Sequence, residues 1–342
     1  MTVLKRGSAF ALRRGIMPAF WAFLLLLTPF SIQASRNLLF WEAQAVAGYF
    51  GSNQAWELYS HHPHDAMQKP SLGIDYLGRF GNAGKDFGYL AMQARLAYDK
   101  NEANKLQPQL YNAFINWKAP IADIWLGHNK TALGLSSYLD NHSLLLADNT
   151  MSGLNFDRDW GAGIKAETML LDLSASVTTG SGMPLWVGKN HLLVLRAGLG
   201  DPNKDNHSLG VSVAQGKILK SMGYTVMHNN KLHELRLGGL DAAWRYLDLD
   251  IKGDLLYGSY DSDPAYAALF RTGLFLLPEE RAILDLQAHL TKLKDAENQY
   301  YTVGLSYRLT PYLSLRTAIT RHDPGGHDSV ALQVYCYKGI VF

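Results

Sequence analysis

The chain has 342 residues, of which 47% are hydrophobic, and it carries 32 Lys and Arg residues against 30 Asp and Glu residues. Four of the basic residues and none of the acidic ones lie in residues 1–34, so the remainder has a net charge of −2. This balance gives no indication of a nucleic-acid partner. The single cysteine, Cys336, excludes an internal disulfide.

The N-terminal segment has the pattern of an export signal. Basic residues precede the apolar run PAFWAFLLLL, and the segment ends on the small residue Ala34. The apolar run is shorter than the ~20 residues that a membrane-spanning helix needs, which makes a retained anchor the weaker alternative. We predict a secretory signal peptide at residues 1–34, cleaved after Ala34, and a single domain at residues 35–342.

Downstream of the signal, apolar and polar residues alternate in about sixteen runs bounded by Gly, Asn, Asp and Pro. In the clearest run, residues 246–260, Leu249 and Leu255 fall on one face while Asp250 and Asp254 fall on the other. A strand that crosses a bilayer pairs its backbone with its neighbours and presents apolar side chains outward at every second position. The pattern therefore predicts an all-β fold, a transmembrane antiparallel β-barrel of about sixteen strands.

A phase change in the pattern and the lengths of the connections lead to two further expectations. Around Gly238 and Gly239, Leu235 and Leu237 give way to Leu240 in the opposite phase, which a glycine bulge would explain. The connections between runs alternate in length, as expected when all the long loops leave one end of a barrel and both termini lie at the other. The long connections are residues 52–70, 131–157, 179–189 and 218–231.

The connection at residues 131–157 follows the fifth predicted strand and is long and rich in apolar residues, which suits packing inside a lumen. A barrel of about sixteen strands leaves an aqueous channel rather than a filled core. We therefore expect this connection to fold inward and to narrow the channel.

The segment around this loop resembles the phosphate-selective porins of the O and P type. In that family the corresponding segment runs from a glycine-lysine motif to an Arg-Asp-x-Gly motif, and residues 239–260 resemble a later hairpin of the family. The matching positions are Gly127, Lys130, Gly134, Ser136, Arg158, Asp159 and Gly161. The resemblance implies an outer-membrane porin of a Gram-negative bacterium, a possible homotrimer, and recognition of the C-terminal aromatic residue Phe342 by the barrel assembly machinery.

Charged side chains of both signs fall on the predicted inner face, a mixture that favours a general polar channel over an anion-specific one. We expect passive diffusion of small hydrophilic solutes and ions through a barrel that also contacts outer-membrane lipids. A phosphate-type anion channel is the first alternative. The narrowest point is expected where Asp140, His142 and Asp148 lie opposite Arg79 and Arg95. The predicted pore-lining and constriction residues are Arg79, Arg95, Lys118, Lys130, Asp140, His142, Asp148, Arg158, Arg196, Arg236, Asp248, Asp250, Lys252 and Asp254.

Other function classes receive less support from the sequence. The cluster HHPHD, with His61, His62 and His64, has the residue types of a transition-metal site, but no further Cys or His pair is spaced to complete one, and we predict neither a metal nor a cofactor. No GxSxG elbow is present, and we expect no enzymatic activity. A barrel that serves as a sleeve for a partner such as a cytochrome conduit is a further alternative.

Overall fold

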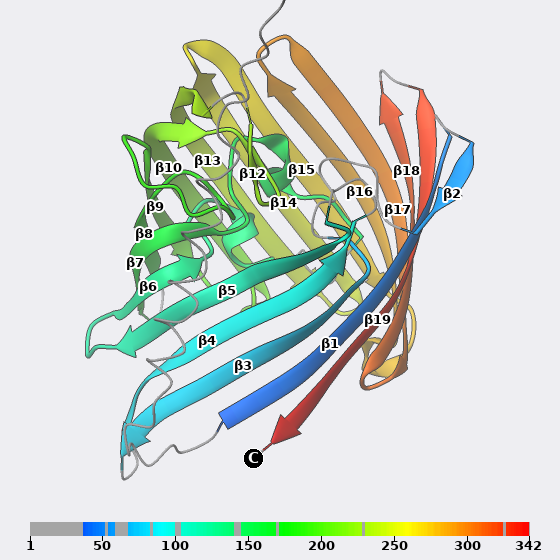
Figure 1. Cartoon of the computed structure of the whole chain (residues 1–342), viewed down its shortest axis with the longest axis horizontal. Coiled ribbons are helices and arrows are strands. Elements are labelled where there is room, and N and C mark those ends of the chain that lie inside the picture. Colours follow the sequence, from blue (N-terminus) through cyan, green and yellow to red (C-terminus); the bar gives the residue numbers. More distant parts are fainter. Residues whose placement is uncertain are drawn as a thin grey trace, which may run out of the picture.

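The computed structural model describes residues 37–51, 54–58, 68–82, 85–99, 104–139, 145–168, 171–227, 230–323 and 326–341. Sixteen antiparallel strands close into a barrel, in which the first strand pairs with both the second barrel strand and the last (Figure 1). The predicted fold and strand number are confirmed. The predicted signal peptide and Phe342 lie outside the described residues. Within the described ranges, no helix has the length and apolarity to cross a bilayer.

The barrel strands follow one another in chain order around the wall. They are β1 (Asn37–Phe50), β3 (Ser71–Asn82), β4 (Lys85–Tyr98), β5 (Leu106–Lys118), β6 (Asp123–Asn129), β7 (Asp159–Glu167), β8 (Leu171–Thr178), β9 (His191–Leu199), β10 (His207–Leu219), β13 (Leu232–Tyr246), β14 (Leu249–Tyr260), β15 (Asp263–Phe275), β16 (Ala282–Leu293), β17 (Ala296–Thr310), β18 (Leu313–Asp323) and β19 (His327–Val341). The short elements are β2 (Ala55–Glu57), β11 (Ser221–Met222), β12 (Thr225–Val226) and the 3-10 turns η2 (Leu135–Ser137), η3 (Asn149–Ser152) and η5 (Pro278–Glu280).

Alternation sorts the side chains of each strand between the outer face and the lumen. In β14, Leu255 and Tyr257 are 43% and 63% exposed on the outer face, whereas the alternate residues Asp254 and Leu256 are buried. In β10, exposed and buried residues alternate from His207 to Ile218. The outer face is apolar because it meets lipid, while the inner face must match whatever fills the lumen.

The two ends of the barrel differ in their connections. Residues 37 and 341 lie at the end that we call the terminal end, since Leu38 pairs with Val341. The opposite end, the loop end, carries the long connections of the first half of the chain. The expected alternation of long and short connections is wrong for the second half, because two-residue turns also close the β14–β15 and β16–β17 hairpins at the loop end.

The β14–β15 turn shows how these hairpins close so tightly. Asp261 and Ser262 both have positive φ, 52° and 73°, which is the type I′ geometry that matches strand twist. The Asp261 carboxylate accepts the backbone N–H of Glu234 at 3.0 Å and the Lys294 Nζ at 3.1 Å, and it lies 2.6 Å from the ring nitrogen of His233. Burial acts to raise the pKa of Asp261, but the hydrogen bonds from His233 and Lys294 outweigh it and lower the pKa to about 2.

The predicted glycine bulge in β13 is absent. The pairing of β13 with β10 and β14 is continuous through the glycine pair 238–239. Leu235 and Leu237 instead face the lumen, where they are buried in an apolar cluster. Arg236 between them therefore shares the exposed outer face with Leu240. The prediction that Arg236 lines the pore is wrong, because a lumen-facing segment covered by a loop is as apolar as a lipid-facing one.

Candidate pore and constriction loop

The connection between β6 and β7, residues 130–158, is folded inward, and we call it loop 3; the structure describes its residues 130–139 and 145–158. Leu133 and Leu154 of loop 3 have no exposed surface and belong to the same apolar cluster as the barrel wall. Burying a leucine side chain contributes about 1.5–3 kcal/mol. The loop is thus anchored to one sector of the wall. The wall residues of this cluster are Leu192, Val194, Ala214, Ile218, Leu235, Leu237, Leu256, Tyr260, Ala265 and Ala267.

Loop 3 is stiffened by hydrogen bonds within itself. Asn155 Nδ2 donates to Ser136 Oγ at 2.6 Å, and Ser136 Oγ donates to the carbonyl of Leu133 at 2.6 Å. Gly134 lies against the wall with φ 60°, and a Cβ there would approach Asp254 Oδ1 to 2.6 Å. Two of the positions matched to the porin motif, Gly134 and Ser136, therefore have structural roles in seating the loop.

A polar cluster fastens loop 3 to the wall on the terminal-end side of the apolar anchor. We call it the Tyr138 clamp, and it consists of Tyr138 on the loop, Asp172 on β8, Arg196 on β9 and Asp241 on β13. The Tyr138 hydroxyl donates to Asp172 and accepts from Arg196 Nη1 at 2.8 Å. Arg196 also makes two hydrogen bonds to Asp241, at 2.7 and 3.0 Å, with no exposed side-chain surface. Burial and the Asp172 carboxylate raise the pKa of Tyr138, so the phenol stays protonated.

A second polar cluster joins the end of loop 3 to β4 and β5. Arg158 lies over the ring of Tyr111 at 3.6 Å, and Arg95 lies over the same ring at 5.9 Å. Arg158 pairs with Asp157 at 2.6 Å, and Arg95 Nε donates to Gln109 at 2.7 Å. Both guanidinium groups, predicted to line the pore, are thus buried and engaged with neighbouring side chains.

The predicted narrow point is not assembled as expected. Arg79 lies three residues from the end of β3 and Arg95 three residues from the end of antiparallel β4, so the two lie toward opposite ends of the barrel. Asp148 is 1% exposed and accepts the N–H of Thr150 at 2.9 Å to cap η3. Its carboxylate is therefore turned into loop 3. Asp140 and His142 lie outside the described residues.

The remaining predicted residues lie on several levels of the lumen. Lys118, at the terminal end, pairs with Asp86 at 2.7 Å, and Lys130 donates to the carbonyl of Leu139 within loop 3. Asp250 and Lys252 form an ion pair on the inner face of β14, and Asp248 lies in the turn before it. Lys118, Asp250 and Lys252 thus each pair with a neighbouring charge instead of forming a continuous row of like charges along the pore.

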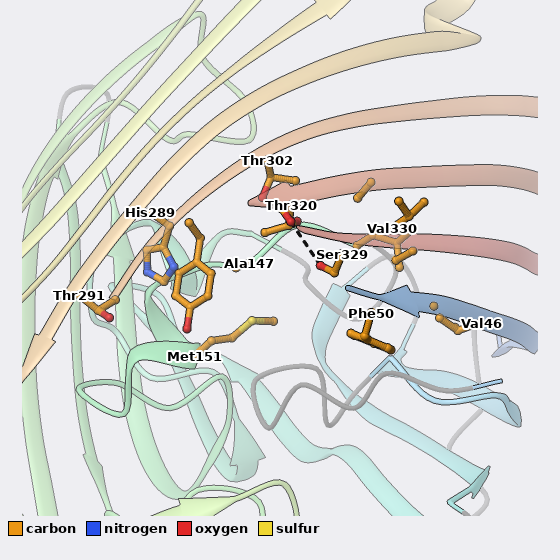
Figure 2. Close-up of a pocket in the computed structure, with 15 residues that line it drawn as sticks. Val46, Phe50, Ala147, Met151, His289, Thr291, Thr302, Thr320, Ser329 and Val330 are labelled. Atoms are coloured by element: carbon orange, nitrogen blue, oxygen red, sulfur yellow. Dashed lines mark hydrogen bonds between the residues drawn. The ribbon is translucent and has the colours of Figure 1, made fainter. Parts of the chain in front are cut away.

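Away from the anchored sector, a cavity separates loop 3 from the wall (Figure 2). We call it the side passage. The space between its lining residues, with the adjoining open solvent included, is about 770 Å³. Strands β1 and β16–β19 form its outer side, and Ala147 and Met151 of loop 3 form its inner side. The lining residues are Val46, Gly48, Phe50, Leu145, Ala147, Met151, His289, Thr291, Tyr300, Thr302, Ala318, Thr320, Ser329, Val330 and Ala331.

Small residues hollow the wall of the side passage. Gly304, Ala318, Ala331 and Gly48 are successive partners across β17, β18, β19 and β1. The two glycines let the Phe50 ring and the Leu146 side chain approach the wall, and the two alanines leave space that larger inward side chains would fill. The predicted site did not contain these residues. A signal was present in the sequence, since the inward-facing positions of these strands combine hydroxyl-bearing and small residues.

No protein-family model and no curated protein matches this chain. Solved structures do: OmpF of Salmonella typhi, in a complex with daunomycin, has a TM-score of 0.65 at 9% identity over 88% of this chain and 97% of that one. The fold is that of bacterial porins. An anion-selective porin from Comamonas acidovorans has a TM-score of 0.61 at 11% identity, covering 90% of this chain and 100% of its own.

A third similar structure is OmpT of Vibrio cholerae in its trimer form, with a TM-score of 0.61 at 10% identity over 88% of this chain and 99% of that one. Such low identities establish the fold, and the resemblance to the phosphate-selective O and P family stays a prediction. Among the described residues, no group of three or more His, Cys, Asp or Glu side chains is placed to hold a metal ion. The HHPHD cluster lies outside these residues.

Proposed function

We propose that this chain is an outer-membrane porin through which small hydrophilic solutes and ions diffuse passively. The observation that carries the proposal is the side passage, a cavity left between an inward-folded loop 3 and a closed barrel wall. The apolar outer face supports a location in lipid, and the polar inner face supports a water-filled interior. The proposal includes export by the signal peptide at residues 1–34, a mature single domain at 35–342, and no catalytic activity.

A general channel is favoured over a phosphate-type anion channel. An anion ladder needs cationic groups that face the solution and pass an anion from one to the next. Arg196 is committed to Asp241 and Arg158 to Asp157, each at 2.7 Å or less. Both guanidinium groups hold the inner wall and loop 3 together, and their charges are already paired with carboxylates.

Planar-bilayer conductance of the refolded mature protein tests the porin function. Ala318 is 3% exposed in the wall of the side passage, and the next residue, Ile319, is 54% exposed on the outer face. We expect Ala318→Trp to reduce the single-channel conductance several-fold, because the indole would fill the hollow of the wall. Ile319→Trp, the matched control, should leave the conductance unchanged.

The outcomes separate the proposed functions. A correctly folded barrel that conducts no ions would contradict the porin proposal and favour a sleeve for a partner protein. Block of the current by added phosphate would favour the anion channel. Equal conductance of the Ala318→Trp and wild-type proteins would show that the current does not use the side passage.

We also propose that the protein forms a homotrimer. Separately, we propose that the barrel assembly machinery recognises Phe342. The trimer form of OmpT, which shares this fold, supports the oligomeric state. Native mass spectrometry from detergent micelles measures the subunit number directly, and a monomer alone would refute the trimer. Deletion of Phe342 should reduce the amount of folded protein in the outer membrane.

A further inference from the structure

Two charged groups beside the side passage, Arg271 and Asp148, are held by neighbouring groups of the protein. Arg271 on β15 is 6% exposed; its Nε donates to Gln287 at 2.8 Å and its Nη2 to the carbonyl of Ala147 at 3.0 Å. Asp148, next to Ala147, is occupied by the η3 cap. The edge of loop 3 therefore presents Leu145, Ala147 and Met151 to the passage. Of the fifteen lining residues in the described part of the chain, none is Asp, Glu, Lys or Arg.

Hydroxyl groups line the opposite wall. Thr302 on β17 and Thr320 on β18 are partners in register, and their hydroxyls lie 3.0 Å apart (Figure 2). Ser329 is the next partner on β19, and its hydroxyl donates to the carbonyl of Thr320 at 3.4 Å. A hydroxyl both donates and accepts, so this row can exchange hydrogen bonds with a passing solute without changing charge.

Planar rings form the next row toward the loop end. His289, Tyr300 and His322 are partners across β16, β17 and β18. The ring centres of His289 and Tyr300 are 6.0 Å apart, and those of Tyr300 and His322 are 4.6 Å apart with only 8° between their planes. His289 and Tyr300 also line the passage, so ring surface and hydroxyl groups meet at the same opening.

We propose that the side passage favours small, uncharged, hydroxylated solutes over ions of equal size. This inference rests on the proposed porin function and names its solute class. A charged solute would lose hydration in a narrow opening that offers no counter-charge. A sugar replaces its water hydrogen bonds with those of the Thr and Ser row and lays its C–H surface against the rings.

Uptake of labelled solutes into proteoliposomes tests this preference. Glucose, gluconate and glucosamine have nearly the same size but are neutral, anionic and cationic, and KCl on both sides prevents charge from building up. We expect glucose to enter at least ~10-fold faster than either ion, a difference of about 1.4 kcal/mol in the barrier. Equal entry of all three solutes through a channel that conducts KCl would overturn the inference and leave the porin function intact.

Substitutions assign the preference to the wall. The double variant Thr302→Val with Thr320→Val keeps the shape of the wall but removes two hydroxyls, and it should slow glucose entry several-fold. Thr302→Ser, the matched control, keeps the hydroxyl and should behave like the wild type. Thr320→Asp should raise glucosamine entry relative to glucose. Unchanged ratios in both the double variant and Thr320→Asp, with the heat-dependent gel shift of a folded barrel, would also overturn the inference.

Should neither KCl conductance nor uptake of any of the three solutes be detected, the porin function itself would be refuted together with this inference. Failure of the preference alone is therefore distinguishable from failure of the pore.

Discussion

The Tyr138 clamp can be tested with the removal of a single oxygen atom. Tyr138→Phe deletes the hydroxyl that joins loop 3 to Asp172 and Arg196, while the ring that lies 4.7 Å from the Arg196 guanidinium carbon stays in place. A hydrogen bond to a charged group contributes about 1.5–3 kcal/mol. Asp172 and Arg196 remain 3.5 Å apart and keep each other as partners, so we expect a net loss of about 2 kcal/mol in the docking free energy.

Hydrogen exchange in the segment next to the clamp measures this loss. The amides of Tyr138 and Leu139 both donate to the carbonyl of Leu135, at 2.9 and 3.0 Å, and they exchange when this turn of loop 3 opens. A loss of about 2 kcal/mol corresponds to a roughly 30-fold faster exchange in Tyr138→Phe. Tyr257→Phe, which removes a hydroxyl from the outer face, provides the matched control and should leave exchange in loop 3 unchanged.

Wild-type exchange rates at these two amides in a correctly folded Tyr138→Phe barrel would refute a contribution of the Tyr138 hydroxyl to the docking of loop 3. That result would mean that the apolar anchor alone fixes loop 3. The clamp would then be a consequence of docking and contribute nothing measurable to it.

Three further predictions concern the core, the charge pattern and pH. Leu133→Ala should lower the free energy of unfolding in micelles by about 2–5 kcal/mol, whereas Leu240→Ala on the outer face should change it by only about 0.5 kcal/mol; similar urea midpoints would contradict the apolar anchor. Arg316 of β18 lies on the inner wall, where its Nη1 donates to the buried Gln333 at 2.9 Å. Arg236→Glu should leave the reversal potential in a KCl gradient unchanged, while Arg316→Glu should shift it toward cation selectivity. A shift with Arg236→Glu would contradict the outward placement of Arg236. Because the pKa of Asp261 is lowered to about 2 from its ordinary 3.8, its stabilisation is complete above pH 3.8 and is lost as the pH falls through about 2. The destabilisation by Asp261→Asn, measured from urea midpoints, should therefore vanish near pH 2.

The strands and their number were predictable because the two faces of most strands meet environments of opposite polarity. In β14 apolar and charged residues alternate from Leu249 to Leu255, and along this stretch the predicted outer and inner faces are those observed. Leu256 is apolar on the inner face because it packs in the cluster under loop 3. In β13 the same pattern is misleading. Leu235 and Leu237 face a loop that arrives from about 100 residues away in the chain, so their apolar character carries no information about lipid.

The candidate site was less predictable, because its properties depend on the conformation of loop 3. Asp148 is a charged residue of the kind expected at a constriction, but its carboxylate accepts the N–H of Thr150 and therefore points into the loop. Arg158 is likewise a cation in the sequence and part of a buried cluster in the structure. Which charges reach the solution is decided by such local hydrogen bonds, and alternation cannot reveal them.

The closure of the barrel has a consequence for when the protein becomes active. β1 and β19 pair over thirteen register positions although they are separated by almost the entire chain. The side passage straddles this seam, with Gly48 on one strand and Ala331 directly opposite on the other. An unclosed sheet therefore has no passage, however complete its other hairpins are. The first and last segments of the chain must therefore pair before the passage is complete.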